Sequence, residues 1–370
     1  MKNLSRSLAT GVMLAVSALF ISGCGGNNSK NGSDSTANGS PGTSSSATLI
    51  GAGSTFVYPL FSKMFSEYGP ANNLEINYQS IGSGGGILQL TNKTVDFGGS
   101  DAPLNNEQAQ KIGVPVLHIP IASGADVITY NIPGVSASLK MTPGVLADIY
   151  LGKITKWNNP AIVAINKDVQ LPGLDIFVVH RSDGSGTSFI WTDYLSKVST
   201  EWATKVGKGT AVKWPTGIGG KGNEGVSGLV KQTPGAIGYV ELAYAIQNNM
   251  PVAQVQNASG RFIKPELTSI TSASNVKLPD DAKVSLTNTS NADGYPISSF
   301  TWGLLYKEQN YGGRSLQHAT DLLNLFWWVI HDGQKYCKPL NYAPLSSSAV
   351  SVAENILKSA TYNGKPILNK

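Results

Sequence analysis

Cysteine is nearly absent from this chain. Its 370 residues include two, Cys24 and Cys337. We expect no disulfide within the chain, because Cys24 belongs to an N-terminal leader and Cys337 is then left without a partner. Cys337 lies among Tyr336, Lys338 and Pro339, and we expect this lone thiol to be unreactive.

Charge is also scarce. Only 14% of the residues are charged, and the formal net charge is +5. The sequence has no run of Lys or Arg, and its aromatic residues do not alternate with basic ones. Proteins that bind nucleic acids carry basic patches, so the composition gives no support to that class. Low charge together with 41 glycines is typical of a compact, loop-rich α/β protein.

The signatures of many enzymes are missing. There is no Gly-x-Ser-x-Gly nucleophile motif, and His118, His180, His318 and His331 lack the spacing of metal ligands. Residues 217–222 match Gly-x-Gly-x-x-Gly, but they follow Trp-Pro-Thr rather than a strand, and no helix is expected to begin there. The stretch also lacks the spacing of a P-loop. We therefore expect no nucleotide, metal or other cofactor.

The first residues indicate an exported protein. Lys2 and Arg6 precede an apolar stretch at 8–21, which is too short to span a bilayer comfortably. The stretch ends in Ile-Ser-Gly-Cys, which resembles the lipobox of bacterial lipoproteins. We expect a signal peptide over 1–23, lipidation of Cys24 and a membrane-anchored protein in the periplasm or at the cell surface. An ordinary signal peptide with an unrelated cysteine is the alternative.

Residues 24–46 are expected to be a flexible linker, because after Cys24 they contain only small and polar residue types. The folded body beginning near residue 47 is long for one hydrophobic core, so two domains are expected. Strand-like runs occur at 74–76, 116–119, 126–130, 176–179, 237–239 and 300–306, and helical stretches at 143–150, 225–231 and 315–330. This alternation predicts an α/β fold with helices on both faces of its sheets.

Three stretches of small residues each follow a strand-like run and precede a helix-like one. They are residues 51–56 (GAGSTF), 81–86 (IGSGGG) and 181–188 (RSDGSGTS). The N-terminus of a helix presents free N–H groups and a positive dipole end, which suit an anion. Arg181 adds a planar cation. One such stretch could be an ordinary loop, but the three together predict a site for a tetrahedral oxyanion.

Further motifs extend along the body. They are YQSIGSGGG (78–86), VDFGGSDAPL (95–104), DIYLGKI (148–154) with Trp157, GGKGN (219–223) and PGAIGYVE (234–241). With the stretches above, they make the chain resemble the phosphate-specific substrate-binding proteins of bacterial ABC phosphate transporters, essentially from Thr48 onward. Departures occur at Ser54, where the family often has Ala or another small residue, and at Gly84, where it has a second Ser.

The resemblance implies a two-lobed periplasmic-binding-protein fold, in which each lobe is a mixed sheet flanked by helices. The first lobe would comprise residues 47–121 and 298–370, and the second 122–297, with crossovers near Ile121–Ala122 and Pro296–Ile297. The implied function is a receptor that captures inorganic phosphate and delivers it to the permease and ATPase of an ABC importer.

The resemblance also implies which residues bind phosphate. They are Thr55, Phe56, Ser83 and Asp101 from the first lobe, and Arg181, Ser185, Gly186 and Thr187 from the second. Thr55 and Ser83 would use their hydroxyls and any free N–H groups, and Phe56 its backbone N–H alone. Asp183 would orient Arg181 and moderate its charge.

Asp101 would select the ligand. A carboxylate beside a bound anion is repulsive unless a proton lies between them. Mono- and dihydrogen phosphate carry that proton, whereas sulfate does not. Spacing alone does not separate Asp101 from Asp96 in the same motif; the resemblance selects Asp101 and leaves Asp96 a structural hydrogen bond to neighbouring turn N–H groups.

Two other functions remain open. An exported phosphatase or phosphotransferase could use the same oxyanion site, but Ser185 has no orienting base in the sequence. His180 is the one histidine near the site, and we interpret it as a strand residue rather than a catalytic base. A receptor for sulfate or another oxyanion is the second alternative, which Asp101 opposes.

Overall fold

The computed structural model describes residues 47–370. The predicted signal peptide, the lipidation of Cys24 and the linker lie outside the described residues. Within the described part of the chain, no helix is both long and apolar enough to cross a membrane. Cys337 is buried, and burial raises the pKa of its thiol to about 12, which favours an unreactive residue.

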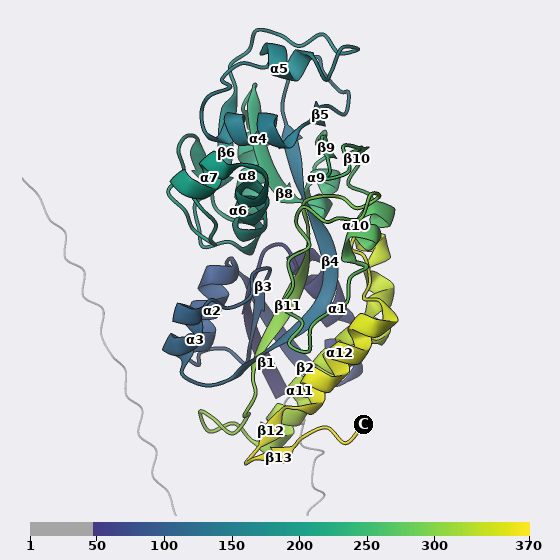
Figure 1. The fold of residues 1–370 in the computed structure, drawn as a ribbon. Helices are drawn as coiled ribbons and strands as arrows, with labels where there is room; N and C mark the ends of the chain where they lie inside the picture. The colour runs from purple at the N-terminus through teal and green to yellow at the C-terminus, as the bar shows by residue number, and fades with distance from the viewer. Residues whose placement is uncertain (1–46) are drawn as a thin grey trace, which may run out of the picture. The chain divides into compact units, whose positions relative to one another are not determined.

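One eight-stranded sheet runs through both lobes in the order β2-β1-β3-β11-β4-β8-β6-β7 (Figure 1). Its strands are β1 (Ala47–Gly53), β2 (Leu74–Ser80), β3 (Phe97–Ser100), β4 (Val116–Tyr130), β6 (Phe177–Arg181), β7 (Ile218–Gly220), β8 (Ala236–Glu241) and β11 (Ser298–Tyr306). The first three strands are parallel to one another, as are β6, β7 and β8, whereas β4 and β11 are antiparallel to their neighbours. This mixed sheet confirms the predicted α/β class.

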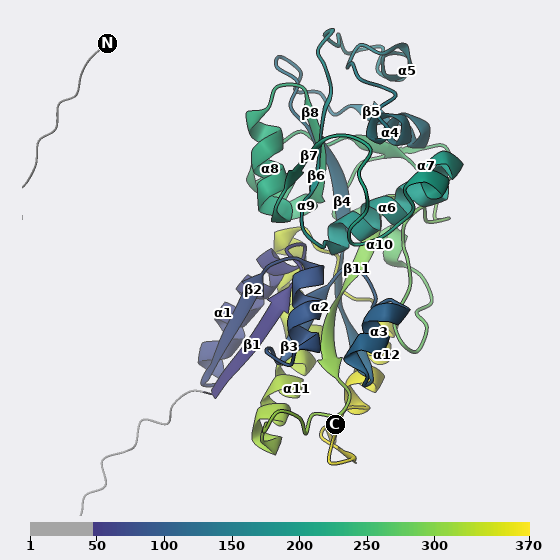
Figure 2. The same cartoon turned by 90° about the vertical axis from the view of Figure 1, so that its left-hand side faces the viewer.

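Short strands complete the β structure. They are β5 (Lys140–Met141), β9 (Gln254–Gln256), β10 (Phe262–Ile263), β12 (Thr361–Tyr362) and β13 (Lys365–Pro366). The helices are α1 (Tyr58–Ala71), α2 (Ser83–Thr91), α3 (Asn106–Ile112), α4 (Pro143–Tyr150), α5 (Pro160–Val163), α6 (Gly186–Val198), α7 (Thr200–Lys205), α8 (Gly222–Gln232), α9 (Leu242–Gln247), α10 (Leu267–Ser274), α11 (Leu316–Ile330) and α12 (Ser347–Lys358). Figure 2 shows α8 on one side of the second-lobe strands and α6 and α4 on the other.

Strand β4 belongs to both lobes. Its first part pairs with β11 and its last part, from Asp126, pairs with β8. The apolar pattern predicts two separate strands here, because the intervening Ala122, Ser123 and Gly124 have low strand propensity. Pairing with β11 nevertheless keeps the segment extended. The register shifts opposite Ile121, so a bulge lies at the predicted crossover.

The glycine-rich stretch 217–222 differs from the prediction. Ile218–Gly220 forms β7 beside β6, and α8 begins at Gly222. Glycine carries little strand signal of its own, so the pairing with β6 decides the conformation. Gly222 has φ +70°, a left-handed conformation that glycine adopts easily. The expectation that no helix begins there is therefore wrong, whereas the stretch does follow Trp-Pro-Thr rather than a strand, because β7 lies within it.

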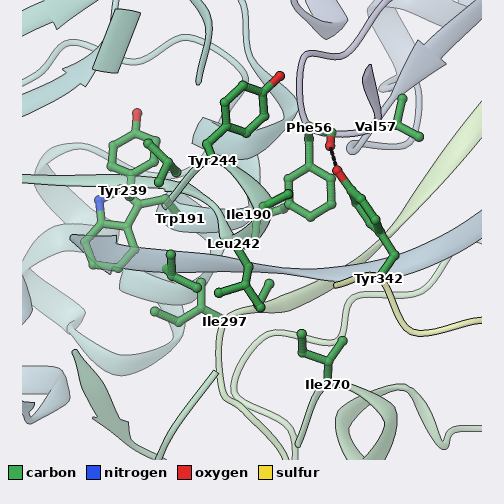
Figure 3. Close-up of a cluster of buried hydrophobic side chains, with 14 of the residues drawn as sticks. Phe56, Val57, Ile190, Trp191, Tyr239, Leu242, Tyr244, Ile270, Ile297 and Tyr342 are labelled. Atoms are coloured by element: carbon green, nitrogen blue, oxygen red, sulfur yellow. Dashed lines mark hydrogen bonds between the residues drawn. The ribbon is translucent and has the colours of Figure 1, made fainter. Parts of the chain in front are cut away.

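A buried cluster of apolar side chains joins the lobes (Figure 3). Tyr342 from the end of the chain donates a hydrogen bond of 2.6 Å to the carbonyl oxygen of Phe56. Tyr244 in α9 donates one of 2.6 Å to the carbonyl oxygen of Thr55. Tyr244 therefore holds the turn between β1 and α1 against the second lobe, and Tyr342 holds the same turn within the first.

Residues 276–287, here called the strap, cross from the second lobe to the first. Leu278 and Leu286 pack in a cluster with Phe300 and Trp302 of β11. The indole N–H of Trp302 donates a hydrogen bond of 3.0 Å to the carbonyl oxygen of Ala282. The strap therefore covers the first lobe although it precedes the predicted crossover near residues 296–297.

Asp193 in α6 connects the second lobe to the strap. Its carboxylate accepts hydrogen bonds from Ser285 (2.7 Å) and Thr287 (2.5 Å) and pairs with Lys197 (2.9 Å) and Lys208 (2.7 Å). Burial alone would raise the pKa of Asp193, but these four donors hold it well below its ordinary value. The ionised form therefore stabilises the fold.

Asp193→Asn keeps the size of the side chain and removes its charge. We expect it to lower the free energy of unfolding by about 1–3 kcal/mol at neutral pH, because both lysines lose their counter-charge. A depressed carboxyl pKa stabilises the fold above the unfolded-state pKa and stops doing so as the pH falls through the folded-state value. Urea unfolding at neutral and acidic pH measures the effect.

Asp280→Asn, at an exposed position of the strap, is the matched control. The interpretation is contradicted if both variants lose the same stability, or if acid leaves the deficit of Asp193→Asn unchanged.

Candidate functional site

Four strand-to-helix turns meet between the lobes. They lead from β1 to α1, from β2 to α2, from β6 to α6 and from β7 to α8. The turns of the two lobes touch, because the N–H of Gly84 donates a hydrogen bond of 2.8 Å to the carbonyl oxygen of Gly184. A β-carbon on Gly84 would lie 3.0 Å from the α-carbon of Gly184, so glycine at both positions permits this close approach.

The predicted hydroxyls of the first lobe accept hydrogen bonds from the second. Thr55 Oγ1 accepts from the side-chain amide of Asn223 (2.7 Å) and from its backbone N–H (3.2 Å). Ser83 Oγ accepts from the N–H of Gly186 at 3.1 Å. Because these N–H donors occupy hydroxyl lone pairs, the hydroxyl protons remain for another acceptor.

The start of α6 supplies the predicted residues of the second lobe. Ser185 is the N-cap, and its Oγ accepts from the N–H of Ser188 at 3.0 Å. Its own N–H donates to the carbonyl oxygen of Thr210 at 2.8 Å, so only its hydroxyl is available to a ligand. Thr187 Oγ1 accepts from Arg181 Nη1 at 3.3 Å. A β-carbon on Gly186 would lie 2.5 Å from Asp101 Oδ2, which explains glycine at this position.

Arg181 and Asp183 form a two-point ion pair. Arg181 Nε lies 2.8 Å from Asp183 Oδ1, and Nη2 lies 2.5 Å from Oδ2. The N–H of Gly222 also donates to Asp183 Oδ1 at 3.0 Å. Burial raises the pKa of Asp183, but the hydrogen bonds and charge of Arg181 lower it below the ordinary value. The guanidinium is thereby oriented and partly neutralised, as the resemblance implies.

Asp101 is buried in the same place. Its carboxylate accepts from Ser54 Oγ (2.7 and 2.6 Å to its two oxygens) and from Thr301 Oγ1 (2.7 Å). Ser83 Oγ is 3.5 Å from Oδ2. Burial raises the pKa of Asp101 to about 6, although Ser54, Thr301 and Arg181 oppose that rise. At neutral pH the side chain is therefore mainly an ionised acceptor.

Asp96 lies in a different environment. Its carboxylate accepts from the N–H of Ile50 (2.7 Å) and from Arg314 Nε (2.7 Å), and it lies 2.8 Å from His318 Nε2. These bonds join β1 to the region of α11. The structure thus gives Asp96 a structural role, although its partners are a strand N–H and two side chains rather than the turn N–H groups expected.

His180 lies in β6, as expected for a strand residue. Its ring stacks on Trp214 with 4.7 Å between centroids, and its Nδ1 lies 3.0 Å from the carbonyl oxygen of Arg181. Ser185 Oγ has no histidine partner in the described residues. Nor does any group of three or more His, Cys, Asp or Glu side chains between residues 47 and 370 form a metal site.

Three further residues complete the site. Asn223 joins Thr55 to Thr187 Oγ1 (3.2 Å) across the lobes, and Ser54 and Thr301 hold Asp101. Ser54 belongs to the motif at 51–56 and Asn223 to the motif at 219–223. Nothing local in the sequence shows which groups these two side chains contact. Thr301 lies 200 positions from Asp101, so only the pairing of β11 beside β3 brings it there.

The backbone N–H of Phe56, which was expected to bind phosphate, has a partner within the protein. This donor points to Ser54 Oγ at 3.0 Å, so it already has a partner within the turn. The ring of Phe56 lies in the cluster between the lobes. Without that N–H, the site offers the guanidinium of Arg181, the carboxylate of Asp101 and four hydroxyls, those of Thr55, Ser83, Ser185 and Thr187. Together these groups can bind a compact anion that carries a proton.

Comparison with known proteins gives the family. A family model described as PBP superfamily domain matches residues 38–331. The phosphate-binding protein PstS of Xylella fastidiosa (strain Temecula1) is 42% identical over 350 residues, covering 91% of this chain and 94% of that protein. The phosphate-binding protein PstS of Pasteurella multocida is 43% identical over 312 residues, covering 83% and 89%.

Solved structures show the same fold. A phosphate-binding protein from Stenotrophomonas maltophilia has a TM-score of 0.63 at 18% identity, covering 82% of this chain and 92% of that one. A putative phosphate ABC transporter substrate-binding protein from Clostridium perfringens, with bound phosphate, has a TM-score of 0.59 at 18% identity, covering 81% and 100%. The chain therefore belongs to the PBP superfamily and, within it, to the family of the phosphate-binding protein PstS.

Proposed function

We propose that this protein captures inorganic phosphate between its two lobes and delivers it to the permease of an ABC importer. One observation carries the proposal: Asp101, buried and able only to accept when ionised, faces a set of hydroxyl donors and a single buried guanidinium. Phosphate satisfies both parts, because its unprotonated oxygens accept from the donors while its hydroxyl donates to Asp101.

Selectivity for phosphate over sulfate follows from the proton that the phosphate hydroxyl donates to Asp101. Sulfate is fully ionised near neutral pH, so one of its oxygens would face Asp101 without a hydrogen between them. Sites that require a hydrogen-bonding group discriminate against ligands lacking it by about 10⁴–10⁵-fold. The names of the similar PstS proteins support phosphate rather than another oxyanion as the cargo.

Binding without chemistry fits the site best. Among residues 47–370 Ser185 has no base beside it, and its Oγ accepts from the N–H of Ser188. An exported phosphatase or phosphotransferase would need an activated nucleophile or a metal. Sustained hydrolysis of a phosphomonoester by the pure protein, lost in Ser185→Ala, would overturn the receptor interpretation.

The cellular setting belongs to the proposal as well. The lipobox at Cys24 favours a lipid-anchored receptor in the periplasm or at the cell surface, tethered by residues 24–46. Mass spectrometry of the protein purified from membranes tests it: a diacylglyceryl-modified N-terminus at Cys24 is expected. Cleavage elsewhere, with Cys24 lost or unmodified, would leave an unanchored exported receptor.

The central experiment is calorimetry of the ligand-stripped body with phosphate, sulfate and arsenate. One phosphate per chain and much weaker binding of sulfate are expected at neutral pH. Comparable binding of sulfate and phosphate would remove Asp101 as the selecting group. Absence of phosphate binding by verified ligand-free protein would overturn the proposed function.

Arg181→Ala should weaken phosphate binding by at least about 2–4 kcal/mol. The change removes the guanidinium and leaves the Asp183 carboxylate unpaired beside the anion. Titration calorimetry of the variant measures the loss. Arg261→Ala is the control, since Arg261 pairs with Asp293 at the exposed surface. If Arg181→Ala weakened phosphate binding by less than tenfold, Arg181 would be peripheral to the site.

Asp101→Asn should reduce the difference in binding affinity between phosphate and sulfate. The amide can present an N–H to a fully ionised oxygen, whereas the wild-type carboxylate cannot. Competition binding at neutral pH and matched ionic strength compares the two ligands in both proteins. A variant that kept the full discrimination would place the selecting acceptor elsewhere.

Ligand should close the lobes. We place the lobes at residues 47–121 with 298–370 and at 122–297, so Thr55, Ser83 and Asp101 lie in one and residues 181–187 in the other. Phosphate therefore stabilises only the state in which both sets meet. Small-angle scattering should give a smaller radius of gyration with phosphate; identical profiles, starting from verified ligand-free protein, would contradict hinge closure.

A further inference from the structure

Two hydroxyls hold the carboxylate of Asp101, and neither is among the phosphate contacts that the sequence indicates. Ser54 Oγ lies 2.7 and 2.6 Å from the two carboxylate oxygens, and Thr301 Oγ1 lies 2.7 Å from Oδ1. Both side chains are buried. Ser54 comes from the turn after β1 and Thr301 from β11, so the carboxylate is held from two elements.

The proton of Ser54 is directed at Asp101 by the backbone. The N–H groups of Phe56 (3.0 Å) and Val57 (3.4 Å) both donate to Ser54 Oγ. With its lone pairs occupied in this way, the hydroxyl acts as a donor, and the carboxylate is the acceptor within reach. A donor that faces a carboxylate favours the ionised form over the neutral acid.

The ionised form of Asp101 needs this support. The side chain is 1% exposed, and burial in a medium of low polarity favours the neutral acid. A neutral Asp101 carries its own proton and can donate to a ligand oxygen. The chain would then accept a fully ionised oxyanion as readily as one that brings a proton.

We propose that Ser54 and Thr301 are positioning residues that keep Asp101 an acceptor, and that they thereby set the pH below which the receptor stops discriminating phosphate from fully ionised oxyanions. The inference rests on the proposed function, because it concerns how the same site selects its ligand. It deepens that function by assigning the selectivity to a three-residue unit rather than to Asp101 alone.

Other ionisable groups also face Asp101. They are Arg181 at the end of β6, Tyr78 of β2, Asp126 of β4, Glu241 of β8 and Tyr342 between α11 and α12. Arg181 favours the ionised form of Asp101. Burial raises the pKa of each of the other four above its ordinary value. Asp126 and Glu241 are the groups whose titration could be mistaken for that of Asp101.

Sulfate is the probe, because it does not titrate near neutral pH and any pH dependence of its binding reports the protein. In wild type, sulfate binding should strengthen as the pH falls through about 6. In Ser54→Ala and in Thr301→Val, the pH at which sulfate binding begins to strengthen should be higher by about one unit. At neutral pH each variant should then bind sulfate up to about tenfold more tightly than wild type.

Matched variants separate this role from a general disturbance of the site. Thr301→Ser retains the hydroxyl and should restore the wild-type pH profile. Asp101→Asn should abolish the pH-dependent onset, and Asp126→Asn should leave its midpoint in place. The interpretation is overturned if Ser54→Ala and Thr301→Val both keep the wild-type midpoint, or if Thr301→Ser shifts it as far as Thr301→Val.

An infrared measurement tests the same idea without any ligand. The carboxyl C=O band that is lost in Asp101→Asn should titrate at higher pH in Ser54→Ala and Thr301→Val than in wild type. If wild type failed to bind phosphate while this shift occurred, the proposed function would fail and the role of the two hydroxyls would stand. If the band titrated at the same pH in all folded variants, the inference would fail whatever the protein binds.

Discussion

Burial is the constraint on which the rest of this site depends. Arg181 is 3% exposed and Asp101 1% exposed, so each charge must be stabilised by the protein instead of by water. The one guanidinium is already paired with Asp183, and the incoming anion must therefore rely largely on neutral N–H and O–H dipoles. Such dipoles are effective where water is excluded, because their field is not screened.

The sheet brings those dipoles together. Strands β4 and β11 reverse direction relative to their neighbours, so the carboxyl ends of β1 and β6 point toward each other from the two halves of the sheet. The helices that follow these strands begin where the halves meet, which is where ligands bind in open α/β sheets. The amide of Asn223 then links Thr55 and Thr187, so one side chain orients a hydroxyl from each lobe.

The sequence revealed the parts of this arrangement that are local. Short motifs of small residues mark the turns at 51–56, 81–86 and 181–188, and helix α4 has the predicted bounds at Pro143–Tyr150. What could not be predicted depends on partners distant in the chain: the small residues in the middle of β4 are extended because β11 pairs with them, and β7 is a strand because β6 does. For the same reason Thr301 carries no local sign that it meets Asp101.

The position of β11 has a consequence for how the chain matures. This strand occupies the slot between β3 and β4, yet it comes from residues 298–306. Until that segment has been synthesised, β3 and β4 each present an unpaired edge, and exposed edges are templates for association with other chains. The first lobe can therefore become complete only after the second, so an early pause in synthesis would leave an aggregation-prone intermediate rather than a finished half.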